Sequence, residues 1–183
     1  MTQSENDAVF PVLPVDRLPQ AEVKERWLIE SLWGKNAVGV LCGHPKAGKS
    51  WAGLDMAVSV ASGTRCLGKF PVHEPGRALI YLAEDSLPAL RERVAAIAAH
   101  RGLRLAELDL QVITAQRMRL DLLEDRERLA ETARRLKPRL LLLDPLVRMH
   151  CLDENDSRAI SGLLSFFRDL QRLLDMAVVI VHV

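Results

Sequence analysis

The eight residues from Gly43 to Ser50 constrain this 183-residue chain more than any other part of its sequence. They read G-x-x-x-x-G-K-S and lie between a short apolar run, 37–42, and a segment with helical spacing, 49–61. Such a chain leaves a strand, wraps its N–H groups around a phosphate, and begins a helix whose N-terminus attracts an anion. The sequence therefore predicts a phosphate-binding loop between a buried strand and a helix.

Each fixed position of this motif has a chemical reason. Gly43 and Gly48 allow the tight backbone path and the close approach of the chain to a phosphate. Lys49 is expected to neutralise the β- and γ-phosphates of a nucleotide, and the Ser50 hydroxyl is expected to bind Mg²⁺. The residues expected to line the phosphates with their backbone are His44, Pro45, Lys46 and Ala47.

Apolar runs alternate with helical segments along the rest of the chain. Strands separated by helices predict parallel crossovers, and hence an α/β sheet covered by helices on both faces. The expected strands are 37–42, 78–83, 110–114, 139–143 and 177–183, and the expected helices are 49–61, 86–100, 124–136 and 156–175.

Residues 1–25 contain three prolines among mixed polar residues and are expected to form a flexible leader before one domain, 26–183. The N-terminus lacks a signal-peptide pattern, and no apolar run approaches the ~18 residues of a membrane span, so a cytoplasmic protein without a membrane partner is expected. The net charge of +1 excludes nucleic-acid binding through bulk positive charge. The three widely spaced cysteines argue against a zinc knuckle or a disulfide framework.

Two carboxylates follow apolar runs, where the carboxyl ends of parallel strands gather ligands. Asp144 follows the run 140–143 and is expected to be the second residue, after Ser50, that holds Mg²⁺. The alternative is that Asp144 is a capping or turn residue before Pro145. Glu84 follows the run 78–83 and is the candidate base that activates water. The alternative for Glu84 is a helix-capping acid, a role that Asp85 fits better.

Other residues carry weaker signals. His182, near the end of the last apolar run, is either a core histidine or a contact to the γ-phosphate. Trp51 is expected to pack in the fold, and Arg91 and Arg93 are expected to lie on a solvated helix face.

In their order along the chain these segments resemble the RecA-like P-loop ATPases, most closely the AAA-25 or RepA-like branch, named after a plasmid replicative hexameric helicase. The resemblance implies an ATP-hydrolysing core that uses Mg²⁺, with Glu84 as catalytic base and His182 as phosphate sensor. Family members often carry two consecutive histidines at the sensor position, whereas this chain has His182 and Val183. The segments that carry the resemblance are WLIESLW, GHPKAGKSWAGLDMAVSVASG, ALIYLAEDS, LLLLDPLVRMHCLDEND and VVIVHV.

The resemblance also implies a homo-oligomeric ring or filament, a hexamer when full length, with single-stranded DNA as a ligand and a helicase-like, replication or recombination role. In the family, a fifth core strand, the DNA-contacting loops and an arginine finger lie further downstream. The chain is therefore expected to be truncated after the sensor strand, with the strand 37–42 left at a bare sheet edge. Two alternatives stay open: a nucleotide-dependent regulatory or assembly module without DNA unwinding, and a P-loop small-molecule kinase, against which Glu84 argues.

Overall fold

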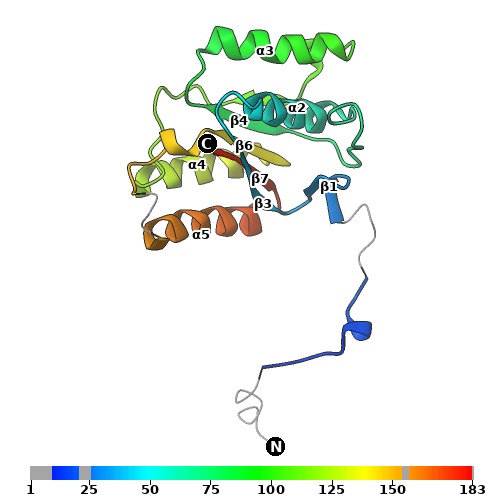
Figure 1. Cartoon of the computed structure of the whole chain (residues 1–183), viewed down its shortest axis with the longest axis vertical. Helices are drawn as coiled ribbons and strands as arrows, with labels where there is room; N and C mark the ends of the chain where they lie inside the picture. The colour runs from blue at the N-terminus through cyan, green and yellow to red at the C-terminus, as the bar shows by residue number, and fades with distance from the viewer. Residues whose placement is uncertain (1–9, 21–25, 154–156, 183) are drawn as a thin grey trace, which may run out of the picture.

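A parallel five-stranded sheet between two layers of helices forms the body of the protein in the computed structural model, which describes residues 10–20, 26–153 and 157–182 (Figure 1). All neighbouring strands of this sheet pair in parallel. The predicted α/β class is therefore confirmed. The strand order is β3 (Val38–Cys42), β7 (Ala177–His182), β6 (Leu140–Asp144), β4 (Ala78–Leu82) and β5 (Leu110–Val112).

Helices cover both faces of the sheet, as predicted (Figure 1). Successive residues of a strand point to opposite faces. Leu140 and Leu142 accordingly pack in the core under α2 and α3, whereas Leu141 and Leu143 pack in the core under α4 and α5. The helices are α2 (Lys49–Ser62), α3 (Leu87–His100), α4 (Leu123–Leu136) and α5 (Ser157–Leu174).

Short elements join and flank these layers. The strands β1 (Trp27–Ile29) and β2 (Trp33–Gly34) form an antiparallel hairpin ahead of β3. Its residues Leu28 and Ile29 are buried in the core that α2 and α3 cover. Single 3₁₀ turns are η1 (Val15–Arg17), η2 (Leu105–Glu107) and η3 (Leu146–Arg148).

The helix that follows the motif is tightly fixed against the sheet. It ends at Gly63, whose φ of 76° suits glycine and whose N–H donates to the Ser59 carbonyl. Gly53 lies over β6, where an added Cβ would come within 2.9 Å of Leu142 Cδ1. The small residue therefore allows α2 to approach the strand that carries Asp144.

The prediction that 37–42 forms a buried strand is wrong in its burial. Val40 of β3 is 44% exposed, and Cys42 is exposed as well. The reason is position, because β3 pairs with β7 alone within the described part of the chain and so lies at an edge of the sheet. The expectation of a bare edge at this strand is confirmed for that part.

The described part of the leader, residues 10–20, is exposed along its whole length and holds only the turn η1 (Figure 1). The leader expected at 1–9 and 21–25, the first residue of the helix expected at 156–175 and the last residue of the strand expected at 177–183 fall outside the described residues. None of the helices in the described ranges combines the length and the apolar character that crossing a membrane requires.

Candidate functional site

The segments that carry the predicted site residues come together because neighbouring parallel strands end at the same edge of the sheet. The register pairs Cys42 of β3 with His182 of β7, and Leu82 of β4 with Asp144 of β6. The backbone N–H of Ala83 donates to the carbonyl of Asp144 over 2.7 Å, which fixes the two strand ends side by side. Carboxyl ends of parallel strands are where α/β sheets bind ligands.

The loop between β3 and α2 has the backbone that the motif predicts. Gly48 caps α2 in the left-handed region at φ 85°, where an L-residue with a side chain would be strained. Gly43 has no such restriction: a Cβ there would make ordinary contacts of 3.9 Å with Ala47 and Lys49. The backbone conformation therefore explains why residue 48 is a glycine. That Gly43 is a glycine because a phosphate approaches it closely stays a prediction.

The ammonium of Lys49 spans the loop. Its Nζ donates to the carbonyl of Gly43 over 2.7 Å and to the carbonyl of His44 over 2.9 Å. A charged group held by two neutral carbonyls can exchange them for phosphate oxygens, which bind it more strongly because they carry negative charge.

Asp144 is almost fully buried, at 5% exposed, on the face of the sheet that α2 covers. Burial raises the pKa of its carboxyl, and the charges of Asp85 and Glu84 raise it further. A hydrogen bond from the Ser50 side chain and the charge of Arg93 act in the opposite direction. The positive charge near the ionised carboxylate is therefore too small to offset its burial and its acidic neighbours.

These residues fit a divalent cation. Asp144 Oδ2 is buried and has no hydrogen-bond partner within the described ranges, next to the hydroxyl of Ser50. A carboxylate and a hydroxyl are the oxygen donors that Mg²⁺ prefers, and protein Mg²⁺ sites leave other positions to water and phosphate oxygens. Among the described residues there is no cluster of three acidic, histidine or cysteine side chains able to hold a metal.

Glu84 lies just beyond β4, with its side chain 54% exposed. Its Oε1 accepts a hydrogen bond of 2.7 Å from Nε of Arg148, which belongs to η3 after Asp144. Sequence reasoning missed this pair, since 64 residues separate the two and neither lies in a motif that names the other. The capping alternative goes to Ser86, whose Oγ accepts from the backbone of Ala89.

His182 points away from the face that carries Asp144. It lies on the same face of β7 as Val178 and Ile180, which pack under α4 and α5, and it lines a cavity of about 170 Å³ with Val40 and His150. Residues 46–50 of the loop line a different hollow. The structure thus does not bring the His182 side chain among the loop residues, and its contact with the γ-phosphate stays a prediction.

Comparison with protein families gives a match over nearly the whole chain. A family model described as an AAA domain, AAA_25, matches residues 4–182. The chain belongs to the AAA_25 family. Comparison with curated proteins gives no match. For this AAA_25 domain, family membership and the parallel sheet together indicate a nucleotide-dependent ATPase of the P-loop type.

Trp51 and Arg93 belong to the site of this AAA_25 domain, contrary to the sequence expectation. Arg93 is not on a solvated face, because its guanidinium lies over the indole of Trp51, 5.5 Å from the ring centroid, and its Nη1 is 2.9 Å from Asp85 Oδ2. Both side chains line the hollow beside the loop. The helix pattern carried a signal, because Arg93 follows the buried Leu90 by three residues, the spacing of side chains on one helix face.

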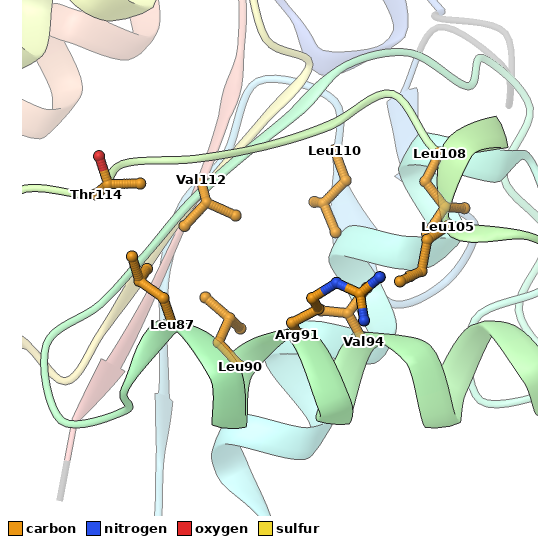
Figure 2. Close-up of a pocket in the computed structure, with 9 residues that line it drawn as sticks. All are labelled: Leu87, Leu90, Arg91, Val94, Leu105, Leu108, Leu110, Val112 and Thr114. Atoms are coloured by element: carbon orange, nitrogen blue, oxygen red, sulfur yellow. The ribbon is translucent and has the colours of Figure 1, made fainter.

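Arg91 belongs to a separate apolar groove between α3 and β5. Figure 2 shows Leu87, Leu90 and Val94 of the helix facing side chains of the strand and of η2 across this groove, whose volume is about 320 Å³. Apart from Arg91 and Thr114 its lining is leucine and valine, so it offers little to a phosphate. The groove is therefore not the nucleotide site. Its lining residues are Leu87, Leu90, Arg91, Val94, Leu105, Leu108, Leu110, Val112 and Thr114.

Proposed function

We propose that this chain is an ATPase core that binds ATP with a divalent cation at the loop 43–50 and hydrolyses its terminal phosphoanhydride bond. One observation carries the proposal: Oδ2 of the buried carboxylate of Asp144, at the end of β6, has no hydrogen-bond partner among the described residues and lies close to the side chain of Ser50 at the beginning of α2. This arrangement supports a cation held between the sheet and the phosphate loop, beside the ammonium of Lys49.

Binding begins with the loop and Lys49. The N–H groups of the loop and the first turn of α2 favour an anion. Lys49 exchanges the carbonyls of Gly43 and His44 for oxygens of the β- and γ-phosphates. A divalent cation bound by Ser50 and Asp144 would neutralise charge on the same phosphates.

In the proposed hydrolysis, Glu84 acts as the general base. Its carboxylate accepts a proton from a water molecule whose oxygen attacks the γ-phosphorus in line with the bond to ADP. The new P–O bond forms as the bond to the β-phosphate oxygen breaks, and ADP leaves. Since Oε1 of Glu84 accepts from Arg148, this ion pair must open or turn before the carboxylate can take the proton.

The resemblance to RepA-like helicases supports a finer proposal. Here the domain works as a homo-oligomeric ring or filament on single-stranded DNA, with His182 as a phosphate sensor. The exposed edge at β3 offers backbone groups with which another strand could pair. Stimulation of ATP turnover by single-stranded DNA would support this proposal, and unchanged turnover with saturating DNA would contradict it.

The pairing of Glu84 with Arg148 favours a second candidate, a module that binds nucleotide and switches assembly without productive turnover. The two candidates differ in which residue matters for partner binding. For such a module, Lys49→Ala abolishes partner binding and Glu84→Gln leaves it intact. For the ATPase, both substitutions stop the work that the assembly does.

Release of ADP from ATP, measured with Mg²⁺ and with excess EDTA, tests the proposed function. We expect turnover only with Mg²⁺, and a fall of about 100-fold or more in Lys49→Ala, because a preorganised charge at the transferred phosphate is lost. The matched control is Lys69→Ala, a lysine over the Phe70 ring outside the site. Equal turnover by wild type and Lys49→Ala would overturn the proposal.

A further inference from the structure

A hollow of about 300 Å³ opens beside the phosphate loop. It is lined by the loop residues 46–50, by Trp51 and by Arg93, and so continues the phosphate site toward the space between α2 and α3. Phosphate binding at the loop accounts for the lining at 46–50. It does not account for an indole in the lining of the same hollow.

Trp51 is unusual for a residue in the first turn of a helix that packs on a sheet. It remains 46% exposed, although its neighbours on α2 include Gly53 and Leu54, which are buried. An exposed indole forgoes much of the stabilisation that burying its apolar surface would give. The expectation that Trp51 is a packing residue therefore leaves its exposure unexplained.

Arg93 holds this indole in place. Its guanidinium lies over the ring at 5.5 Å from the centroid, within the range of a cation–π contact. Its Nη1 is 2.9 Å from the carboxylate of Asp85, which is mostly buried, at 16% exposed. Arg93, paired with the carboxylate of Asp85 just before α3, thus fixes the orientation of an aromatic ring that solvent still reaches.

The order of groups in the site shows what would meet this ring. Ser50 interacts with Asp144 and marks the end of the site where the cation and the γ-phosphate are proposed to lie. Trp51 follows Ser50 by one residue, about 100° around the helix axis, and both side chains line the hollow. A nucleoside triphosphate whose terminal phosphates lie at Lys49 and Ser50 would extend its nucleoside toward Trp51.

We propose that the Trp51 indole, held by Arg93, is the surface on which the nucleobase of the bound nucleotide stacks. This proposal rests on the proposed nucleotide-binding function. It adds that Trp51 is the group that makes the site bind a nucleotide more tightly than a polyphosphate without a base. Stacking on an aromatic side chain uses the π-face that every base has, and it strengthens with ring area. The site is therefore expected to prefer purine to pyrimidine nucleotides.

Calorimetric titration with ATP, CTP and inorganic tripolyphosphate, each with Mg²⁺, tests the proposal without any measure of turnover. Trp51→Ala should weaken ATP binding roughly 5- to 150-fold, the range for loss of one base stack, and should change tripolyphosphate binding by less than about 2-fold. Trp51→Phe should recover most of the ATP affinity, because a phenyl ring can also stack. Wild type should bind ATP more tightly than CTP, and Trp51→Ala should narrow that difference.

Two results would overturn the proposal. One is an equal loss of ATP and tripolyphosphate binding in both Trp51 variants, which would mean that Trp51 supports only the loop. The other is unchanged ATP affinity in Trp51→Ala. Failure of the proposed function itself has a different signature: Lys49→Ala would then bind ATP and tripolyphosphate as tightly as wild type.

Discussion

Arg148 Nε donates a hydrogen bond of 2.7 Å to Oε1 of Glu84. The contact joins the segment after β6 to the residue that follows β4, and both side chains are more than half exposed. Ion pairs in such surroundings contribute about 0–1 kcal/mol, so a competing phosphate or acidic group can displace one partner. The proposed base is thus held by a contact weak enough to open during each catalytic cycle.

Removing the arginine should release the base. We expect Arg148→Gln to raise the basal rate of ATP hydrolysis by up to about 5-fold, the factor that corresponds to about 1 kcal/mol. The measurement is steady-state ADP release at saturating ATP and Mg²⁺. Arg134→Gln serves as the control, because Arg134 pairs with Glu131 on the exposed surface of α4. A basal rate of Arg148→Gln at or below the wild-type rate would contradict this account of the pair.

Asp144 makes the nucleotide-free fold sensitive to pH. Burial raises its pKa above the ordinary value of 3.8, so the folded state binds more protons than the unfolded state between pH 3.8 and the raised pKa. The stability that the protonated carboxyl gives is complete below pH 3.8 and is lost as the pH rises through the folded pKa. Ionised Asp144 therefore weakens the fold at neutral pH when no cation is bound.

Asp144→Asn should for this reason raise the Tm of the nucleotide-free protein at pH 7, where about 1 kcal/mol corresponds to about 2–4 °C. The same variant should lose the additional stabilisation that Mg²⁺ gives to the ATP-bound protein. Differential scanning calorimetry of wild type and variant, with and without ATP and Mg²⁺, measures both effects. A variant less stable than wild type in the absence of ligand, with its Mg²⁺ response intact, would contradict the assignment of Asp144.

Local patterns in the sequence predict most of the fold because helices and strands are specified locally. The helices expected at 49–61 and 86–100 are present as α2 and α3. The burial of β3 was predicted wrongly, since an apolar run has the same appearance at the edge and at the centre of a parallel sheet. Only the strand order shows which strand has one neighbour.

In the candidate site, too, some features could be predicted from the sequence and others could not. The loop and Asp144 were predicted because their spacing and their place after an apolar run carry the chemistry. The contacts of Glu84 with Arg148 and of Trp51 with Arg93 join distant segments, and nothing local in the sequence specifies them. The direction of His182 follows from the alternation along β7, which became informative once the helix covering each face was known.

The three cysteines should differ in reactivity. Burial raises the pKa of Cys66 to about 12, and Asp55 adds to the shift, so its thiolate is rare at pH 8. Cys42 and Cys151 are exposed. A thiol-reactive chromophore at pH 8 should therefore label two thiols per native chain and three after denaturation. Labelling of all three thiols at similar rates in the native protein would contradict the described packing around Cys66.

Cys42 also reports on the loop, because it directly precedes Gly43. ATP with Mg²⁺ should slow its labelling and leave that of Cys151 unchanged. Mass spectrometry of the labelled peptides separates the two sites. Equal protection of both cysteines would indicate a general tightening of the fold in place of binding at the loop.

The central claim is most directly tested by the rate of ATP hydrolysis in Glu84→Gln, measured at saturating ATP and Mg²⁺ alongside the affinity for ATP. Glutamine keeps the size of the side chain and cannot accept the proton from water. The account predicts an affinity within about 3-fold of wild type and a rate lower by about 10²–10⁴, the usual contribution of a general base. The matched control Glu92→Gln, an exposed glutamate on α3, should hydrolyse ATP as wild type does. Hydrolysis by Glu84→Gln at close to the wild-type rate would contradict the assignment of Glu84 and with it the proposed mechanism.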